Sequence, residues 1–424
     1  MIYCYGVIII SDNLTIEKGI SLEGLKLLLV FGLMMVLLGR QAPLGPVMLG
    51  SSLLLAALYH TGPVAFLGMA WQATKSPVTL EMEVILALIM LFEHLLGQQG
   101  YLEKMLLGLR GLIRNQRLVM AMLPAFIGLM PSVGGALFSA PLVGQAAART
   151  SMAAEEKSFI NYYYRHIWEY FLPLYPGVLL ASRLSGLPLP RLIAALAPYG
   201  LLVILLGIPA LRRVKIEPEG EEREGLPASH HALAGELFLS ILPVLVVVAL
   251  VLVFQVEVGL AVGLVLLVLL VRHRYTPLKF WHLCREAIAV KTLLLVWGVM
   301  LFKQVLVDTR AVDGLPSLLA MLPVPEFVIF GLISFLVGML TGLTVAYVGI
   351  AFPIVMTAVG GQISLPLAVF IFIAGFTGNM LTPMHLCLAL TVDFFKADLR
   401  KVLRMMVGPE AALLAVAMAA YLVW

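Results

Sequence analysis

The chain has 424 residues, of which 61% are hydrophobic and only 12% are charged, and its net charge is +4. An ordinary soluble domain is about 25% charged, so this chain is too poor in charge to cover a water-facing surface, which excludes a soluble protein. Its long uncharged runs lack the alternation that a membrane β-barrel requires. The composition therefore predicts an all-α polytopic membrane protein. The small positive charge is attributed to membrane topology and not to nucleic-acid binding.

The predicted elements follow an N-terminal segment, residues 1–22, to which the sequence assigns no role. Six apolar runs come next, then a charged linker at 211–231, and then the same order of runs again. The runs of the first half are 25–39, 44–60, 84–96, 118–147, 162–183 and 192–211. Those of the second half are 237–254, 258–271, 292–307, 327–359, 367–395 and 403–424.

Three short motifs recur about 210 residues apart and in the same order. They are "IMLFEHLL" (89–96) with "VMLFKQVL" (299–306), "APLV" (140–143) with "FPIV" (352–355), and "LYPGVL" (174–179) with "LTPMHL" (381–386). Any one match could be chance in so apolar a chain, but three in order indicate an internal duplication. The repeats are predicted at 23–210 and 232–424.

The run 118–147 contains no charge and would form a helix of roughly 45 Å, longer than the ~30 Å hydrocarbon core of a bilayer. Pro131, Gly134 and Gly135 interrupt it near its middle. Each remaining arm is too short to cross, which predicts a re-entrant hairpin whose tip stops inside the membrane. The run 327–359 is interrupted in the same way and predicts a second hairpin. The alternative is that these residues only allow close helix packing.

Each repeat then has five transmembrane helices plus one hairpin, and an odd number of crossings inserts the second repeat upside down. This is an inverted-topology repeat, an architecture of secondary transporters. Most Lys and Arg residues, including Arg212 and Arg213, then fall on one side of the membrane. That side is the cytoplasm, so the linker is cytoplasmic and both termini lie outside a cell (plasma or inner) membrane.

Helices broken at mid-membrane free backbone groups that must face protein or a water-filled cavity. Backbone amides and a helix N-terminus at such a break suit an anion. "FLPLYPG" (171–177) and "GFTGNMLTP" (375–383) predict two further breaks opposite the hairpin tips. The predicted substrate-binding residues are Ser132, Val133, Gly134, Gly135, Ser139, Thr341, Gly342, Thr344, Asn379 and Thr382.

Ionisable residues inside a span are costly and usually functional. "YRHIWEY" places Arg165 and His166 within reach of Glu169, and His385 follows the last break. We interpret Arg165 as an anion-attracting charge, and His166, Glu169 and His385 as ion-coupling groups, because histidine titrates near neutral pH. The alternative is that Arg165, His166 and Glu169 form a solvated ion pair at the cytoplasmic interface.

Three motifs resemble a family of uncharacterised prokaryotic integral membrane proteins. They are "MPSVGGALFSAPLV", "NYYYRHIWEYFLPLYPG" and "GNMLTPMHLCLALTVDFF". That family is grouped in the ion-transporter superfamily and related to gluconate and proton symporters. The resemblance implies a scaffold and a transport domain, a homodimer, and anion transport by an elevator-like motion. The Ser-Asn-Thr signature of the dicarboxylate branch is only partly present, as Ser132 and, separately, Asn379 and Thr382.

The sequence thus predicts a secondary active transporter of a small anion, coupled to protons or sodium. Two alternatives stay open: a membrane-embedded enzyme using His166 and Glu169, and an anion channel. No Gly-x-x-x-x-Gly-Lys loop is found, so ATP is not expected as a partner. The expected partners are the small anion, the lipid bilayer and a second copy of the chain. No cofactor or metal site is expected, and a bound sodium ion is left open.

Overall fold

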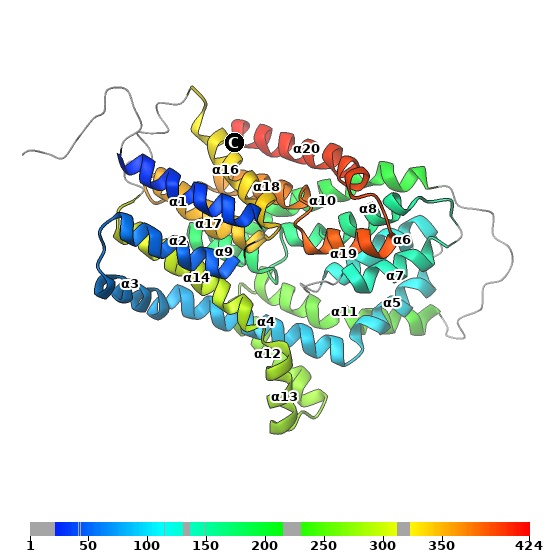
Figure 1. Cartoon of the computed structure of the whole chain (residues 1–424). Coiled ribbons are helices and arrows are strands. Elements are labelled where there is room, and N and C mark those ends of the chain that lie inside the picture. Colours follow the sequence, from blue (N-terminus) through cyan, green and yellow to red (C-terminus); the bar gives the residue numbers. More distant parts are fainter. Residues whose placement is uncertain are drawn as a thin grey trace, which may run out of the picture.

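The structure, a computed structural model of the chain, describes residues 22–40, 42, 44–113, 115–129, 136–148, 150–214, 230–311 and 323–424. Within these residues every secondary-structure element is a helix (Figure 1). Before the linker lie α1 (Leu22–Gly39), α2 (Leu44–Leu58), α3 (Pro63–Lys75), α4 (Pro77–Gln98), α5 (Tyr101–Leu112), α6 (Gln116–Gly128), α7 (Ala136–Ala146), α8 (Ala154–Arg165), the 3-10 helix η1 (Ile167–Tyr170), α9 (Pro176–Ser185) and α10 (Leu189–Arg213). After it lie α11 (His230–Leu252), α12 (Val258–Arg272), α13 (Pro277–Ala287), α14 (Val290–Asp308), α16 (Glu326–Thr341), α17 (Thr344–Ala358), α18 (Leu365–Met380), α19 (Leu386–Phe395) and α20 (Leu399–Val423).

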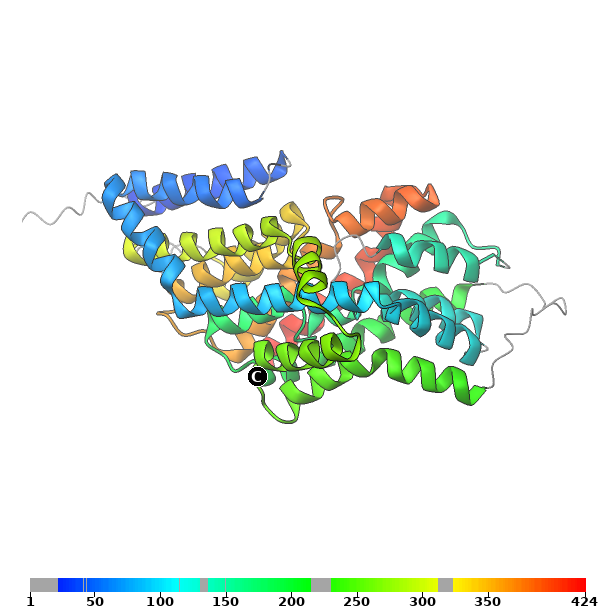
Figure 2. The same ribbon diagram turned by 90° about the horizontal axis from the view of Figure 1, so that it is seen from below.

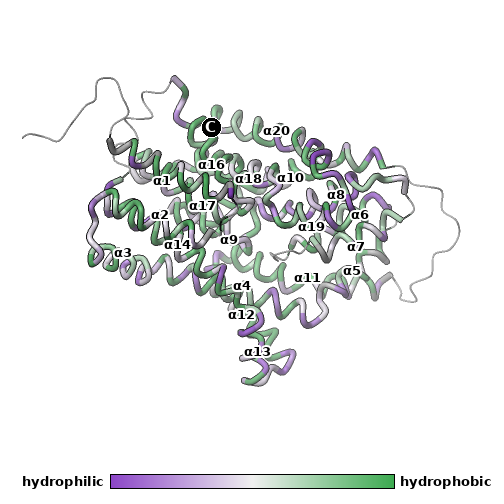
Figure 3. Tube along the Cα trace, viewed as in Figure 1, coloured by the Kyte–Doolittle hydropathy of each residue, from purple (hydrophilic) through white to green (hydrophobic). Residues whose placement is uncertain are grey.

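These helices confirm the helical fold class, and each predicted apolar run corresponds to one helix or to an interrupted pair. In the described part of the chain, four helices are long and apolar enough to cross a membrane: α10, α11, α14 and α20. Hydrophobic side chains cover the outer faces of the bundle, and hydrophobic residues dominate along most helices (Figure 3). Such an exposed apolar surface suits lipid and not water. The sequence analysis did not predict the short helices α3, α5 and α13.

Three of the four predicted interruptions fall near their expected positions, and residues 130–135, which contain the other one, lie outside the described residues. α6 ends at Gly128 and α7 begins at Ala136, while Gly342 separates α16 from α17 in a left-handed conformation, with φ of 62°. Between α18 and α19 the regular helix stops over 381–385. Between α8 and α9 it stops at His166, earlier than the expected prolines. Pro176 does not end α8 but starts α9. At the start of a helix the N–H group that proline lacks would have no partner within the helix.

Most helices of the first half have a counterpart in the same order in the second half, although α5 and η1 have none among the described residues. α9 and α10 begin and end 210 positions before α19 and α20. The residues that end α9 and α19, Gly186 and Lys396, both have positive φ values, 71° and 54°, and are also 210 positions apart. A left-handed backbone suits glycine and strains lysine, so its recurrence at Lys396 reflects the geometry of the turn and not the residue type.

Contacts between the halves come in matched pairs. α4 packs on α12 and α13, and α14 packs on the corresponding α2 and α3. α7 packs on α19 as α17 packs on α9, and α8 packs on α20 as α18 packs on α10. The two views of the ribbon show these segments, far apart in sequence, interleaved through the molecule (Figures 1 and 2). In Figure 1, α10 ends and α11 begins on the right, whereas α1 begins on the left.

Two glycine contacts bring helix backbones together at equivalent places. A Cβ atom on Gly128 would collide with the carbonyl oxygen of Arg165, which holds the end of α6 against the end of α8. A Cβ atom on Gly338 would collide in the same way with the carbonyl oxygen of Gly375, between α16 and α18. The members of the second pair lie 210 positions after those of the first. Small residues of this kind allow the closest helix packing in membrane proteins.

Candidate functional site

Three of the helix interruptions meet at one cavity of about 660 Å³, called the central cavity below. The break after α8 contributes Arg165, His166, Glu169 and Tyr175 to its wall. The break after α18 contributes His385 and Cys387, and the turn between α16 and α17 contributes Gly342 and Thr344. Lys291, at the start of α14, also lines it. The central cavity therefore gathers six of the predicted site residues: Arg165, His166, Glu169, Gly342, Thr344 and His385.

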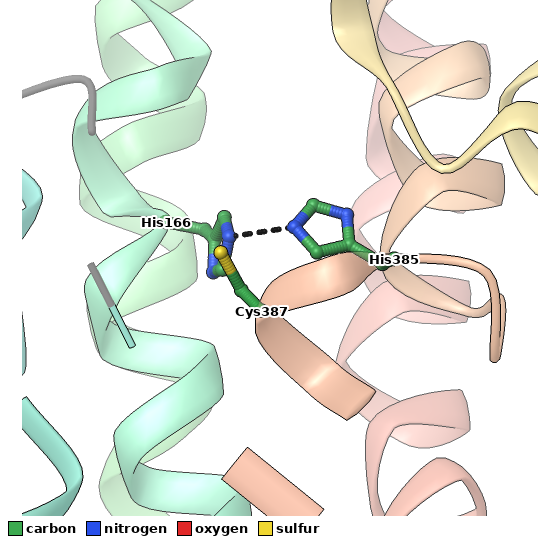
Figure 4. A group of neighbouring side chains, drawn as sticks. All are labelled: His166, His385 and Cys387. Carbon is green, nitrogen blue, oxygen red and sulfur yellow. Dashed lines mark hydrogen bonds between the residues drawn. The ribbon is translucent and has the colours of Figure 1, made fainter. Parts of the chain in front are cut away.

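Two histidines meet at the wall of the cavity (Figure 4). Nε2 of His166 lies 3.0 Å from Nε2 of His385, and the two rings are nearly perpendicular at 83°. Nδ1 of His166 lies 2.6 Å from the backbone oxygen of Tyr162, and Nδ1 of His385 lies 3.0 Å from Oδ1 of Asn379. Both rings are thus fixed by a second contact on their far side.

These contacts limit where the ring protons sit. A backbone oxygen only accepts hydrogen bonds, so Nδ1 of His166 donates, and Nδ1 of His385 donates as long as the oxygen of the Asn379 side chain faces it,. A neutral imidazole has one donor and one acceptor, which leaves both Nε2 atoms with a lone pair pointing at the other. A single proton between them makes one ring an imidazolium and turns a repulsive contact into a charge-assisted hydrogen bond. The geometry is that of a histidine pair that shares one extra proton.

The carboxylate of Glu169 lies beside this pair. Its Oε2 is 3.9 Å from Nε2 of His166, and its Oε1 accepts a hydrogen bond of 2.5 Å from the hydroxyl of Thr344. The Nδ2 group of Asn379 in turn donates to that hydroxyl over 3.5 Å. Thr344 and Asn379 therefore connect the two members of the site that can carry a proton, His385 and Glu169.

Arg165 supplies a permanent positive charge to the central cavity. Its side chain is 2% exposed, and its guanidinium donates to the sulfur of Cys387 over 3.4 Å. The carboxylates of Glu93 and Glu169 lie close enough to interact with it electrostatically. His166 is also only 1% exposed, so its burial argues against the alternative of a solvated ion pair.

His166, His385 and Cys387 each offer one potential metal ligand, and these atoms lie within 4.8 Å of one another. Two nitrogen ligands of a tetrahedral zinc ion, each at about 2.0–2.1 Å, would be separated by about 3.3 Å. The observed 3.0 Å is instead an ordinary hydrogen-bond length,. The guanidinium beside Cys387 also opposes a second cation at this place. The arrangement suits a shared proton better than a metal ion.

The remaining predicted substrate-binding residues fall into two groups. Ser132, Val133, Gly134 and Gly135 lie outside the described residues. Ser139, Thr341, Asn379 and Thr382 are described, but they are not among the residues that line the central cavity. The hydroxyl of Thr341 donates to the carbonyl oxygen of Val337 within its own helix, and that of Thr382 accepts from the N–H of Met384.

The structure adds residues that the sequence analysis did not select. Tyr162 donates to the backbone oxygens of Asn379 and Met380, which bridges α8 to the end of α18. Tyr175 donates to the backbone oxygen of Gly128, and Cys387 contacts Arg165. A sequence signal existed for Cys387, which stands two positions after His385. No spacing rule connects Tyr162 to its partners more than 200 residues away.

Glu410 of α20 is a further buried carboxylate, 1% exposed, that the sequence analysis missed. It lies near the hydroxyls of Tyr170 and Thr377, but neither of its oxygens makes a hydrogen bond of normal geometry. It is separate from the central cavity, whose lining residues do not include it.

Comparison with known proteins begins with the fold. The chain resembles the crystal structure of the Alcanivorax borkumensis YdaH transporter, described as having an unusual topology, with a TM-score of 0.59. The resemblance covers 92% of this chain and 98% of that one at 14% sequence identity. The fold is therefore that of a helical membrane transporter. In a search of curated proteins, none matches.

A family model described as "Protein of unknown function (DUF401)" matches residues 25–424. The chain belongs to this family. The match includes both halves, most of α1 and every described helix from α2 to α20, and it confirms the resemblance to an uncharacterised family.

Proposed function

We propose that the chain is a secondary active transporter that moves a small organic anion across a cell membrane and is driven by a proton gradient. The observation that carries this proposal is the buried guanidinium of Arg165 beside a histidine pair, in a cavity where broken helices meet. Ionisable groups buried in a membrane protein mark substrate and proton pathways. The transporter with the same fold supports the general class, and a relation to gluconate and proton symporters is part of the proposal.

The anion would bind between the turn 341–344 and the segment 132–135, near Asn379 and Thr382. Two features support this position. The N-terminus of α17 begins at Thr344 on the cavity wall, and the N–H groups of a first helical turn favour an anion,. Arg165 supplies the planar charged donor that carboxylates and phosphates prefer. Organic anions fit the cavity because apolar side chains, such as Leu294 and Leu343, line it beside these charges.

Protons are proposed over sodium as the coupling ion. Two facing lone pairs on His166 and His385 already require one proton, and Glu169 can accept another. The oxygens of Thr341, Thr344, Asn379 and Thr382 were the alternative sodium ligands. Thr344 and Asn379 are instead hydrogen-bonded to Glu169 and His385, and Thr341 and Thr382 to their own backbone.

The architecture proposed for transport is a pair of inverted repeats with re-entrant hairpins, 118–147 and 327–359. The matched contacts between halves and the helix pairs α6 with α7 and α16 with α17 support it. The start of α1 and the linker ends of α10 and α11 lie at opposite ends of the molecule, as an odd number of crossings requires (Figure 1). An elevator-like motion, a homodimer, a cytoplasmic linker and external termini complete the proposal.

The test is uptake by the purified chain in liposomes at fixed membrane potential. The probes are radiolabelled gluconate, succinate, lactate and inorganic phosphate, with the pH gradient and the sodium gradient applied separately. We expect accumulation of at least one organic anion that requires the pH gradient. Accumulation driven by sodium alone would refute proton coupling. Flux that never exceeds the electrochemical equilibrium of the anion would indicate a channel instead.

A further inference from the structure

We propose that Asn379 is a two-position switch. The orientation of its side-chain amide depends on whether a proton is held by the histidine pair or by Glu169. In one position the amide oxygen faces His385, and in the other the amide NH₂ group faces it. The inference rests on the proton-coupled function proposed above, but it concerns the hydrogen bonds of this site and can be tested without transport.

The first state is the one in which Glu169 is ionised. Thr344 donates to the carboxylate, Asn379 Nδ2 donates to Thr344, and His385 Nδ1 donates to Asn379 Oδ1. His166 Nδ1 donates to the backbone oxygen of Tyr162. Every donor then has an acceptor, provided that one proton lies between the two Nε2 atoms. The charge of that proton balances the charge of Glu169.

The second state follows when Glu169 takes up a proton and the histidine pair loses one. A protonated carboxyl group donates to the Thr344 hydroxyl, which must then donate onward to an acceptor. The acceptor in reach is Asn379, so its oxygen turns towards Thr344 and its NH₂ group towards His385. Nδ1 of His385 becomes an acceptor, its Nε2 keeps the remaining proton, and that proton is donated to Nε2 of His166. Again every group is satisfied.

The proton balance between the two states is simple. One N–H bond of His385 breaks, its electron pair stays on Nδ1, and one O–H bond forms at Glu169. An amide cannot pass a proton through itself without becoming an unstable imidic acid, so water in the central cavity carries it. His385 and Glu169 both line that cavity. Asn379 and Thr344 are therefore positioning residues. Their hydrogen bonds run in one direction when the proton is on the histidine pair and in the opposite direction when it is on Glu169.

An arrangement that combines the proton location of one state with the Asn379 orientation of the other would be less stable than either state. If the pair lost its proton while Asn379 kept its oxygen towards His385, two Nε2 lone pairs would face each other at 3.0 Å. A buried polar group without a partner is costly. The network therefore reverses as a unit, because Thr344 and Asn379 each have one hydrogen-bond direction available in each state.

Other charged and titratable groups face this network from each element around it. Arg165 interacts electrostatically with both histidines and with Glu169, and Glu93 of α4 and Cys387 of α19 interact with Arg165. Tyr162, Tyr175 and Tyr347 also lie close to Glu169. Arg165 stays charged at all accessible pH values, so it biases the balance without changing between the two states.

The experiment follows two signals on the purified chain as pH is varied. The first is the ¹⁵N spectrum of His385, assigned by its loss in His385→Gln, which distinguishes the Nδ1–H from the Nε2–H form. The second is the infrared band of a protonated carboxyl group, assigned to Glu169 by its loss in Glu169→Gln. The two states hold the same number of protons, so pH does not convert one into the other. We expect two well-separated midpoints, because the network opposes both the gain of a second proton at low pH and the loss of the last proton at high pH.

Thr344→Val removes the hydroxyl that connects the two groups, and Thr344→Ser retains it. We expect the two midpoints to move closer by at least about one pH unit in the valine variant and to keep their separation in the serine variant. Asn379→Ala should also bring them closer and gives a second measurement if the valine variant does not fold. An unchanged separation in a folded valine variant, or a His385 that never changes its protonated nitrogen, would overturn the switch. Either result leaves the uptake test unaffected, so failure of the switch is distinguishable from failure of the proposed function.

Discussion

The two broken helices occupy equivalent places in the two halves, yet they carry different chemistry. Glu169 stands 210 positions before Asn379, and Tyr175 stands 210 positions before His385. Arg165 has no charged counterpart, because the residue 210 positions later is Gly375. The first break therefore provides a cation, a carboxylate and the imidazole of His166, whereas the second provides an amide and the imidazole of His385. The equivalent positions lie 210 residues apart, but the side chains that they carry differ.

This difference has a physical reason. A faithful copy would bury a second guanidinium and a second carboxylate at the same depth, and each buried ion needs a partner to offset its desolvation. Neutral groups such as Asn379 and Thr344 can instead donate or accept according to what they face. One half thus contributes fixed charge, and the other contributes groups whose hydrogen bonds can reverse.

The largest effect is expected from Arg165→Gln, which removes the charge that only the first half has. Loss of a buried charged partner costs roughly 3 kcal/mol, so anion uptake should fall about 100-fold. Arg165→Lys keeps a charge without the planar guanidinium group, so anion uptake should fall about tenfold. The measurement is initial uptake in liposomes. Arg183→Gln, at a 34% exposed arginine of α9 paired with Glu81, is the matched control. Normal uptake by Arg165→Gln would place the anion elsewhere.

The next effect tests whether the carboxylate must belong to the first half. Glu169→Gln should lower proton-driven uptake by about tenfold or more, because a lost charge-assisted hydrogen bond costs about 1.5–3 kcal/mol. Exchange of labelled for unlabelled anion, which needs no net proton movement, should persist. Adding Asn379→Asp introduces a carboxylate at the equivalent position, next to His385. This double variant should recover part of the proton-driven uptake. No recovery in a folded double variant would show that the two positions are not interchangeable.

A smaller effect is expected where the two halves are alike. Gly128→Ala and Gly338→Ala each place a Cβ against a backbone carbonyl group. Overpacking of this kind costs about 1–3 kcal/mol, so both variants should lose thermal stability by similar amounts in detergent. Gly408→Ala in α20 is the control, since nothing lies within 4 Å of its Cβ position. A loss confined to one of the two variants would contradict the equivalence of these contacts.

The smallest effect concerns a contact outside the predicted spans. Backbone N–H groups and then the Lys401 ammonium hold the pKa of Glu155 below its usual value, between the first turns of α8 and α20. Its contribution to stability is therefore present above the usual pKa and is lost as pH falls. Glu155→Gln should lower the melting temperature at pH 7 by about 1 °C or less, and the difference should vanish near pH 4. A difference that grows on acidification would contradict this sign.

Much of the fold could be predicted from the sequence, because hydrophobic runs and their interruptions by Pro and Gly are local signals. α10 and α20 extend only a few residues beyond the runs that predicted them. α5 and α13 were missed because their charged residues break the hydrophobic pattern. α3, whose one charged residue is Lys75, was missed because its 13 residues are too few to cross a membrane,. For α13 a start signal existed, since Thr276 caps a helix that begins with Pro277.

The site could be predicted in part. Arg165, His166, Glu169 and His385 were recognisable as ionisable residues in apolar surroundings. Their pairing was not, because His166 meets His385 across 219 residues and the repeat offset would have placed Tyr175 opposite His385. Thr344 and Asn379 were selected as binding groups, but a sequence does not show that a hydroxyl and an amide lie in series between two titratable side chains.

The glycine contacts have a mechanical consequence. Because backbones touch there, α6 and α8 form one block and α16 and α18 another, and neither block can shear internally without a collision. His166 and Glu169 lie directly after α8, whereas Asn379 lies in α18, His385 follows α18, and Thr344 is the first residue of α17. The hydrogen-bonded circuit therefore connects the two halves twice, at the two histidines and at Thr344 with Glu169. A motion that separates these segments would break both contacts together, so the circuit also holds the two halves together at the central cavity.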